Sequence, residues 1–116
     1  MATPLLTAAQ RQQLLANGRQ TAAGADLDPH PVVKLFTPDG AATWLLSELD
    51  PDTPTRAFGL CDLGLGEPEL GSVDLTELAG LRGRLGLPME RDAHFVADRP
   101  LSAYATSARN AGRITV

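Results

Sequence analysis

The chain has 116 residues and a formal net charge of −4, with 43% hydrophobic and 21% charged residues. This is enough for one domain with a single core, and the composition is that of an ordinary globular protein. No segment has the roughly 20 apolar residues of a membrane helix, and the N-terminal stretch lacks the features of a signal peptide. The chain has one cysteine, which excludes an internal disulfide framework. We therefore expect a cytoplasmic protein with no membrane contact.

The charge is distributed unevenly along the chain. Residues 1–75 have a net charge of −6, whereas residues 76–116 have a net charge of +2 and contain six arginines. A general duplex-DNA binder needs a basic face that contacts phosphates. The acidic body argues against that function, and a local basic patch in the C-terminal third remains an alternative.

The first predicted helix begins after Thr7. Thr7 can cap the helix and Gln10 completes a capping box, while the Asn-Gly pair that follows predicts its end near residue 18. The next segment contains two prolines and is predicted to be a loop. We therefore divide the chain into an N-terminal helix and linker, residues 1–30, and a single α+β domain, residues 31–116.

Four strand-like runs follow, "VVKLF", "ATWLLSELD", "TRAFGLCDL" and "ELGSVDL", separated by turns rich in Pro, Gly and Asp. Pairing them about their turns predicts an antiparallel meander. One face would carry Trp44, Leu46, Glu48, Phe58, Leu60, Asp62, Val73 and Leu75. The other would carry Leu45, Leu49, Cys61, Leu63 and Leu70 among Ser47, Ser72 and Asp74. This second face is too apolar for open water, so we expect the N-terminal helix or a partner to cover it.

The remaining elements complete the predicted fold. Asp74 can cap a short helix that ends near Arg82, residues 89–96 alternate as in a half-buried strand, and residues 100–112 predict a last helix. The expected fold class is α+β, an antiparallel meander of four to five strands packed with about three helices.

The stretch "GLCDLGLGEPELG", residues 59–71, contains four glycines and three carboxylates. A phosphate-binding loop precedes a helix, whereas this stretch lies between two predicted strands, and its acids would repel phosphate. We interpret it as a hairpin loop whose glycines permit positive φ angles, and we expect no cofactor. Glu67, Glu69 and Asp62 are its candidate contacts to a basic protein partner.

Asp62 is predicted to lie on the core face, where an unpaired carboxylate is costly. Arg91 also lies on an otherwise apolar strand face. We therefore predict a structural ion pair of Asp62 or Glu48 with Arg91, with a catalytic role for Asp62 as the alternative.

The C-terminal half offers side chains for two further chemistries. Glu90, Asp92 and His94 share one face, as metal ligands could, but they spread over about 13 Å and would need His30 or the acidic loop to close a site. A solvated face is the simpler interpretation, and we expect no metal. Cys61 could be a nucleophile with His94 as its base, although a buried cysteine in a central strand is commoner.

Four blocks of the sequence together resemble a known family: "VVKLFTPDGAATWLLSELDPD", "AFGLCDLGLGEPELGSVDLTEL", "RGRLGLPMERDAHF" and "LSAYA". Over roughly residues 31–113, the chain resembles a family of short bacterial proteins known only as a domain of unknown function. Members of that family are typically encoded on plasmids and integrative conjugative elements, often near antirestriction and conjugation genes. The resemblance implies a mobile-element accessory protein, and it implies no catalytic residues.

The sequence leads to one function and two alternatives. We expect a non-enzymatic cytoplasmic accessory protein that binds another protein, in counter-defence or conjugation. The first alternative is a single-stranded nucleic-acid binder with Phe95 and Tyr104 as stacking platforms. It would use Arg82, Arg84, Arg99, Arg109 and Arg113. The second alternative is a small hydrolase built on Cys61, Asp62 and His94.

Overall fold

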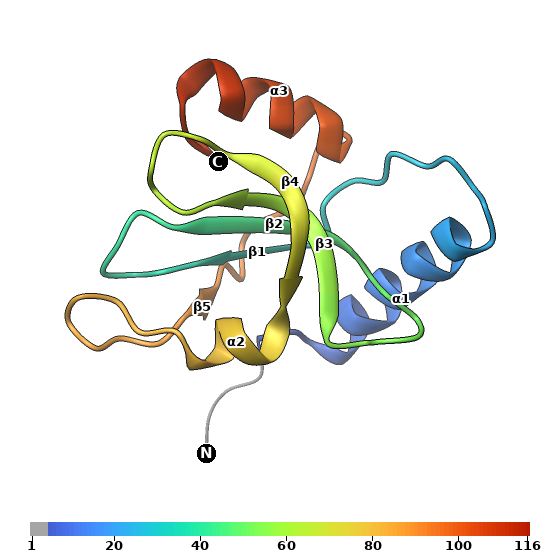
Figure 1. The fold of residues 1–116 in the computed structure, drawn as a ribbon, viewed down its shortest axis with the longest axis horizontal. Coiled ribbons are helices and arrows are strands. Elements are labelled where there is room, and N and C mark those ends of the chain that lie inside the picture. Colours follow the sequence, from blue (N-terminus) through green and yellow to red (C-terminus); the bar gives the residue numbers. More distant parts are fainter. Residues whose placement is uncertain (1–4) are drawn as a thin grey trace.

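The computed structural model describes residues 5–116. The elements in chain order are α1 (Ala8–Ala22), β1 (Val33–Phe36), β2 (Thr43–Leu49), β3 (Arg56–Asp62), β4 (Glu69–Asp74), α2 (Leu75–Gly80), β5 (Glu90–Arg91) and α3 (Leu101–Ala111). The five strands form one antiparallel sheet in the order β4-β3-β2-β1-β5 (Figure 1). The expected α+β class, a meander with three helices, is confirmed.

Helix α1 begins at the predicted capping box. The Thr7 hydroxyl accepts a hydrogen bond from the Gln10 amide (3.1 Å), and the Gln10 side chain accepts one from the Thr7 amide (3.0 Å). The helix continues past Gly18 to Ala22, so the predicted end near residue 18 is wrong. A Cβ atom on Gly18 would lie 1.7 Å from the Leu49 carbonyl oxygen. Gly18 therefore allows a close approach between α1 and β2 and is not a stop signal.

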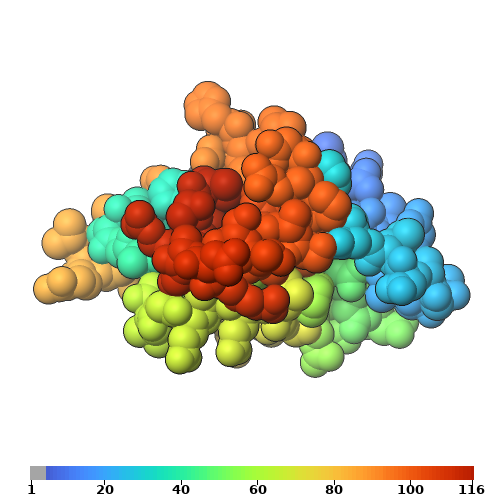
Figure 2. Space-filling model, turned by 90° about the horizontal axis from the view of Figure 1, so that it is seen from above, coloured from blue at the N-terminus to red at the C-terminus, as the bar shows by residue number. Residues whose placement is uncertain are grey.

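Helices cover both faces of the sheet. On one face, Trp44 and Leu46 belong to a core cluster that also contains Leu14 of α1 and Leu78 of α2. On the other face, a second cluster joins Leu45 and Leu60 to Leu101, Tyr104, Ala105 and Ala108 of α3. Figure 2 shows α3 and the adjoining C-terminal segments lying over this side of the molecule. The second face is thus covered by the C-terminal helix, whereas the sequence analysis assigned this role to the N-terminal helix or a partner.

The strand register also differs from the prediction. Trp44 lies opposite Cys61 and Leu45 lies opposite Leu60, so Leu60 and Asp62 do not share a face with Trp44. The register shifts between Leu46 and Glu48, where one extra residue of β2 forms a bulge. The prediction paired even-numbered residues of β2 with even-numbered residues of β3. Because of the bulge, this pairing holds only beyond it, where Glu48 lies opposite Phe58.

The two edges of the sheet differ in length. The strand predicted over residues 89–96 is reduced to Glu90–Arg91, because the Asp92 carboxylate accepts a hydrogen bond from the His94 amide (2.9 Å) and turns the chain. Phe95 then packs in the cluster under α3. At the opposite edge, β4 extends over six residues. Within residues 5–116, no helix combines the length and apolar character needed to cross a bilayer.

Candidate functional site

The outer edge of β4 is the longest open edge of the sheet. β4 pairs with β3, and no other strand of the described chain pairs with it. The Leu75 amide donates to the Thr55 carbonyl (2.8 Å), in register with the β3–β4 pairing. Because hydrogen-bonded and non-hydrogen-bonded pairs alternate in an antiparallel ladder, Gly71 and Val73 direct their backbone groups to β3. Leu70 and Ser72 therefore direct theirs outward.

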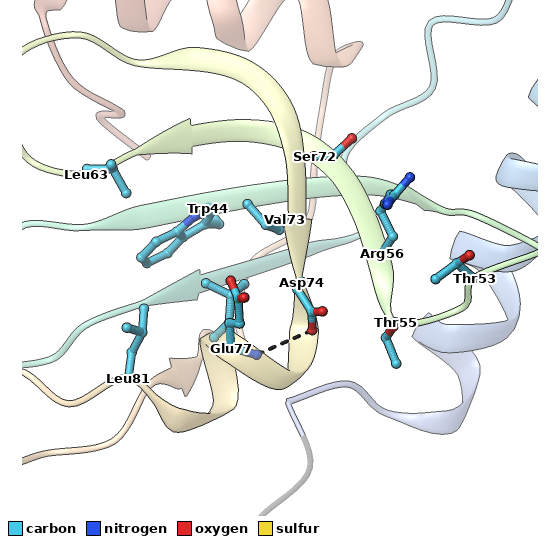
Figure 3. A pocket seen from close by; sticks show the side chains of 11 residues that line it. Trp44, Thr53, Thr55, Arg56, Leu63, Ser72, Val73, Asp74, Glu77 and Leu81 are labelled. Atoms are coloured by element: carbon cyan, nitrogen blue, oxygen red, sulfur yellow. Dashed lines mark hydrogen bonds between the residues drawn. The ribbon is translucent and has the colours of Figure 1, made fainter.

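A groove of about 550 Å³ runs beside β4 on the α2 side of the sheet. We call it the β4 groove, and it is lined by Trp44, Thr53, Thr55, Arg56, Leu63, Ser72, Val73, Asp74, Glu77, Leu78 and Leu81. Figure 3 shows Leu63, Trp44 and Leu81 gathered toward one end and Thr53, Thr55 and Arg56 toward the other. The β4 groove thus has an apolar half and a polar half.

The charges around the groove are mainly acidic. The Asp74 carboxylate caps α2 and accepts hydrogen bonds from the amides of Thr76 (2.7 Å) and Glu77 (3.4 Å). The side chains of Glu67, Glu69 and Glu77 are exposed, and in the part of the chain that the structure describes none of the three forms an ion pair. These three carboxylates are therefore available to a cationic partner.

The glycine-rich stretch contains a hairpin loop, residues 63–68, as its sequence predicts, and its two ends belong to β3 and β4. Gly64 and Gly66 have φ angles of +81° and +85°, values that favour glycine. Leu63 and Leu65 in this loop are 61% and 79% exposed. The loop connects β3 to β4, so it places Glu67 at the start of the open edge.

Asp62 has a structural role that the sequence analysis missed. It is 2% exposed, and its two carboxylate oxygens accept hydrogen bonds from the amides of Gly64 (2.8 Å) and Ile114 (2.8 Å). It therefore joins the hairpin loop to the C-terminal tail. An aspartate two residues before a glycine is typical of a turn of this kind, a signal that was present in the sequence.

The predicted ion pair with Arg91 is wrong for Asp62. Arg91 lies opposite Leu35 in the register and so on the face of Trp44, whereas Asp62 lies on the other face. The Arg91 guanidinium donates to the Leu5 carbonyl (3.0 Å). Glu48 lies near the C-terminal end of β2. Its carboxylate accepts a hydrogen bond from the Thr21 hydroxyl of α1 (2.7 Å), and among the residues that the structure describes no ion pair joins Glu48 to Arg91.

The residues of the hydrolase alternative do not converge. Cys61 and Asp62 point to opposite faces of β3, and burial raises the pKa of the Cys61 thiol, which disfavours the thiolate. His94 follows β5, which lies three strands from β3, about 14 Å at the usual strand spacing. This distance exceeds a direct or one-water contact between the Cys61 thiol and the His94 imidazole.

The Asp92 carboxylate, just after β5, is bound by neighbouring groups. The Asp92 carboxylate forms an ion pair with Lys34 (3.4 Å), and the hydrogen bond from the His94 amide, together with Lys34, lowers its pKa. Among residues 5–116, no three His, Cys, Asp or Glu side chains form a group that could hold a metal ion. Glu90 and His94 are solvent-exposed, in agreement with the simpler interpretation.

The arginines of the nucleic-acid alternative form two separate groups. Arg82 and Arg84 lie in the loop after α2. Arg109 lies in the last turn of α3, and Arg99 and Arg113 flank that helix, on the opposite side of the sheet (Figure 1). The Arg82 guanidinium donates to two carbonyls at the end of α2 (3.2 and 2.8 Å), so it caps that helix. The five arginines do not form one continuous surface.

The proposed stacking residues are part of the core. Tyr104 is 5% exposed, and its hydroxyl donates to the Asp98 carboxylate (2.9 Å). The rings of Phe95 and Tyr104 lie 6.2 Å apart, and the Arg99 guanidinium lies 5.2 Å from the Tyr104 ring. The Tyr104 ring is therefore not open to a nucleic-acid base.

The loop of residues 81–88 is a second surface feature that sequence reasoning missed. It projects beyond the β1–β2 loop (Figure 2), and Leu85 is 80% exposed. The Asp39 carboxylate accepts hydrogen bonds from the amides of Leu85 (2.7 Å) and Leu87 (3.4 Å). A Cβ atom on Gly83 would lie 1.6 Å from Asp39 Oδ1, so a side chain at this position would displace the Asp39 carboxylate.

Comparisons with known proteins identify the family. Residues 5–115 match the family described as "Protein of unknown function (DUF2958)", and the chain belongs to that family. The match includes α1, so it is longer than the resemblance over residues 31–113. A search of curated proteins found no match, and a search of solved structures found none.

Proposed function

We propose that this member of the DUF2958 family is a non-enzymatic module that binds another protein through the outer edge of β4 and the β4 groove. One observation carries the proposal: the outer edge of the six-residue strand β4 pairs with no other strand of residues 5–116 and lies beside a groove with an apolar half. Long open edges are templates for pairing with another chain, and proteins commonly protect them. The opposite edge is only two residues long.

The surroundings of the groove favour binding over catalysis. The candidate nucleophile and base lie in separate parts of the sheet, and the buried carboxylate of Asp62 is occupied by two backbone amides. The three exposed acids, Glu67, Glu69 and Glu77, supply charge without a reacting group beside them. Such a surface can select a basic partner and increase its association rate.

The cellular setting is part of the proposal. The family resemblance to plasmid-borne and conjugative-element proteins supports an accessory role in counter-defence or conjugation. We propose that the module acts in the bacterial cytoplasm on a protein of the host or of the mobile element.

The test is affinity capture from a bacterial lysate, with and without nuclease treatment, after chemical cross-linking. We compare the wild type with the Glu67→Lys/Glu69→Lys double variant. Glu90→Lys is the control, because Glu90 is an exposed acid on the opposite edge. We expect a specific protein that both the wild type and Glu90→Lys retain and the double variant loses. Equal capture by all three proteins would contradict the proposed surface, and nucleic acid in place of protein would favour the arginine groups.

A further inference from the structure

We propose that the occupant of the β4 groove is an extended segment of the partner protein that adds to β4 as a sixth strand. The segment carries one large apolar residue with Lys or Arg on either side of it. This inference rests on the proposed function and specifies the chemistry of the bound chain.

The backbone of β4 is set to accept a strand. Leu70 and Ser72 direct their amide and carbonyl groups away from β3, because the pairs on either side of them bond to β3. An added strand bonds to such outward groups, and in strand addition these main-chain bonds supply affinity that depends little on sequence. Specificity must then come from side chains on alternate positions.

The edge of β4 lacks the usual protection against pairing. No lysine or proline lies within Glu69–Asp74, and the β3–β4 register continues without a bulge. The central residues "LGSV" carry no charge, and Leu70 is 37% exposed. The opposite edge, by contrast, is protected by the shortness of β5 and by the Asp92 turn.

Gly71 leaves room for an apolar side chain. A Cβ atom at Gly71 would have no heavy atom within 4 Å. Relative to an added strand, Gly71 occupies a non-hydrogen-bonded pair, in which facing side chains come closest. A large apolar residue opposite Gly71 therefore fills this space. Val73 lies next along the same face and contributes to the apolar lining of the β4 groove together with Trp44. Aromatic side chains rescue strand glycines in this way.

The charges select a basic segment. Glu69 lies two residues from Gly71 on the same face, and Glu77 of α2 lines the groove, while Arg56 is the one basic residue of the lining. Opposite charges on facing strand positions attract, and like charges repel. Lys or Arg on either side of the apolar residue matches Glu69 and Glu77. A second copy of this chain, pairing through its own β4, would bring acids to acids.

The test uses a library of random 12-residue peptides displayed on phage and selected against the full chain. Selected peptides are resynthesised, and their affinity is measured by fluorescence anisotropy. Ser72→Pro removes the outward amide and keeps the bonds to β3, since proline is tolerated at such edge positions; Ser72→Ala is the matched control. We expect peptides with an apolar residue between basic ones, bound at least about tenfold more weakly by Ser72→Pro and equally well by Ser72→Ala.

A second measurement does not depend on the proline variant. In the wild-type chain, hydrogen exchange at the Leu70 and Ser72 amides slows on peptide binding if these amides bond to the added strand. Peptides that lack the basic and apolar pattern, unchanged exchange at both amides, or self-association in place of peptide binding would each overturn the inference. In those cases the proposed function still stands if cross-linking captures a protein that the Glu67→Lys/Glu69→Lys variant loses.

Discussion

Replacement of Asp62 tests the most specific structural assignment in the chain. Asp62 is buried, and its carboxylate accepts hydrogen bonds from the amides of Gly64 and Ile114, both at 2.8 Å. Hydrogen bonds to a charged group contribute about 1.5–3 kcal/mol each, so we expect Asp62→Ala to lower the free energy of unfolding by about 3–6 kcal/mol. A domain of this size has a total of about 5–15 kcal/mol. Asp62→Asn retains one acceptor oxygen, so it should lose about half as much.

Urea unfolding followed by the fluorescence of Trp44 measures this effect, because Trp44 is the only tryptophan and is 2% exposed. With a slope of about 2 kcal/mol per M, the midpoint of Asp62→Ala should fall by about 1.5–3 M. Glu67→Ala removes an exposed carboxylate from the same loop and is the control, expected to stay within about 0.5 kcal/mol of the wild type. If Asp62→Ala unfolds at the wild-type midpoint, or if Asn and Ala cost the same, the proposed double acceptor is refuted.

Three further predictions follow from single contacts. A glycine-to-alanine substitution normally stabilises a helix, but the Cβ of Gly18→Ala would lie 1.7 Å from the Leu49 carbonyl oxygen of β2. We therefore expect the free energy of unfolding in urea to fall by about 3 kcal/mol. A gain in stability would contradict the close approach. Gly83→Ala displaces the Asp39 carboxylate, so amide exchange at Leu85 should accelerate, and unchanged exchange would argue against this anchor. Because partial burial raises the pKa of Cys61, its thiol should react with an aromatic disulfide at pH 8 more slowly in the folded chain than in urea. Equal rates would exclude this protection of the thiol.

The elements that local rules determine were predicted well from the sequence. The capping box of Thr7 and Gln10 and the cap at Asp74 act within three residues along the chain, and both are present in the structure. The four-strand meander follows from the turns between its runs. Such features depend on neighbours in sequence, which a single chain displays directly.

Two of the errors concern contacts between distant segments, and a third concerns a local turn. The bulge in β2 reversed the face of Leu60, and nothing in the local pattern marks it. Gly18 looked like a helix end because its contact with Leu49 is formed only by the packed fold. The predicted alternation of residues 89–96 is not kept, because the turn at Asp92 ends the strand after two residues and Ala93 of the predicted inner face is exposed.

The candidate site was predicted only in part. The acids Glu67 and Glu69 were selected from the sequence, and they lie beside the open edge of β4. That edge could not be predicted, because strand order depends on where β5 pairs, and β5 has too few residues to signal its partner. The contribution of Gly71 depends on empty space beside it, which is a property of the folded chain.

The shortness of β5 also limits the stoichiometry of strand addition. A fibril grows only if every unit offers two competent edges, so that each added unit exposes a new one. With β5 reduced to two residues, this sheet offers only one long edge. Two copies of this chain that paired through β4 would leave only the short β5 edges exposed, so an unprotected edge can be kept for recognition without making the chain a seed for polymerisation.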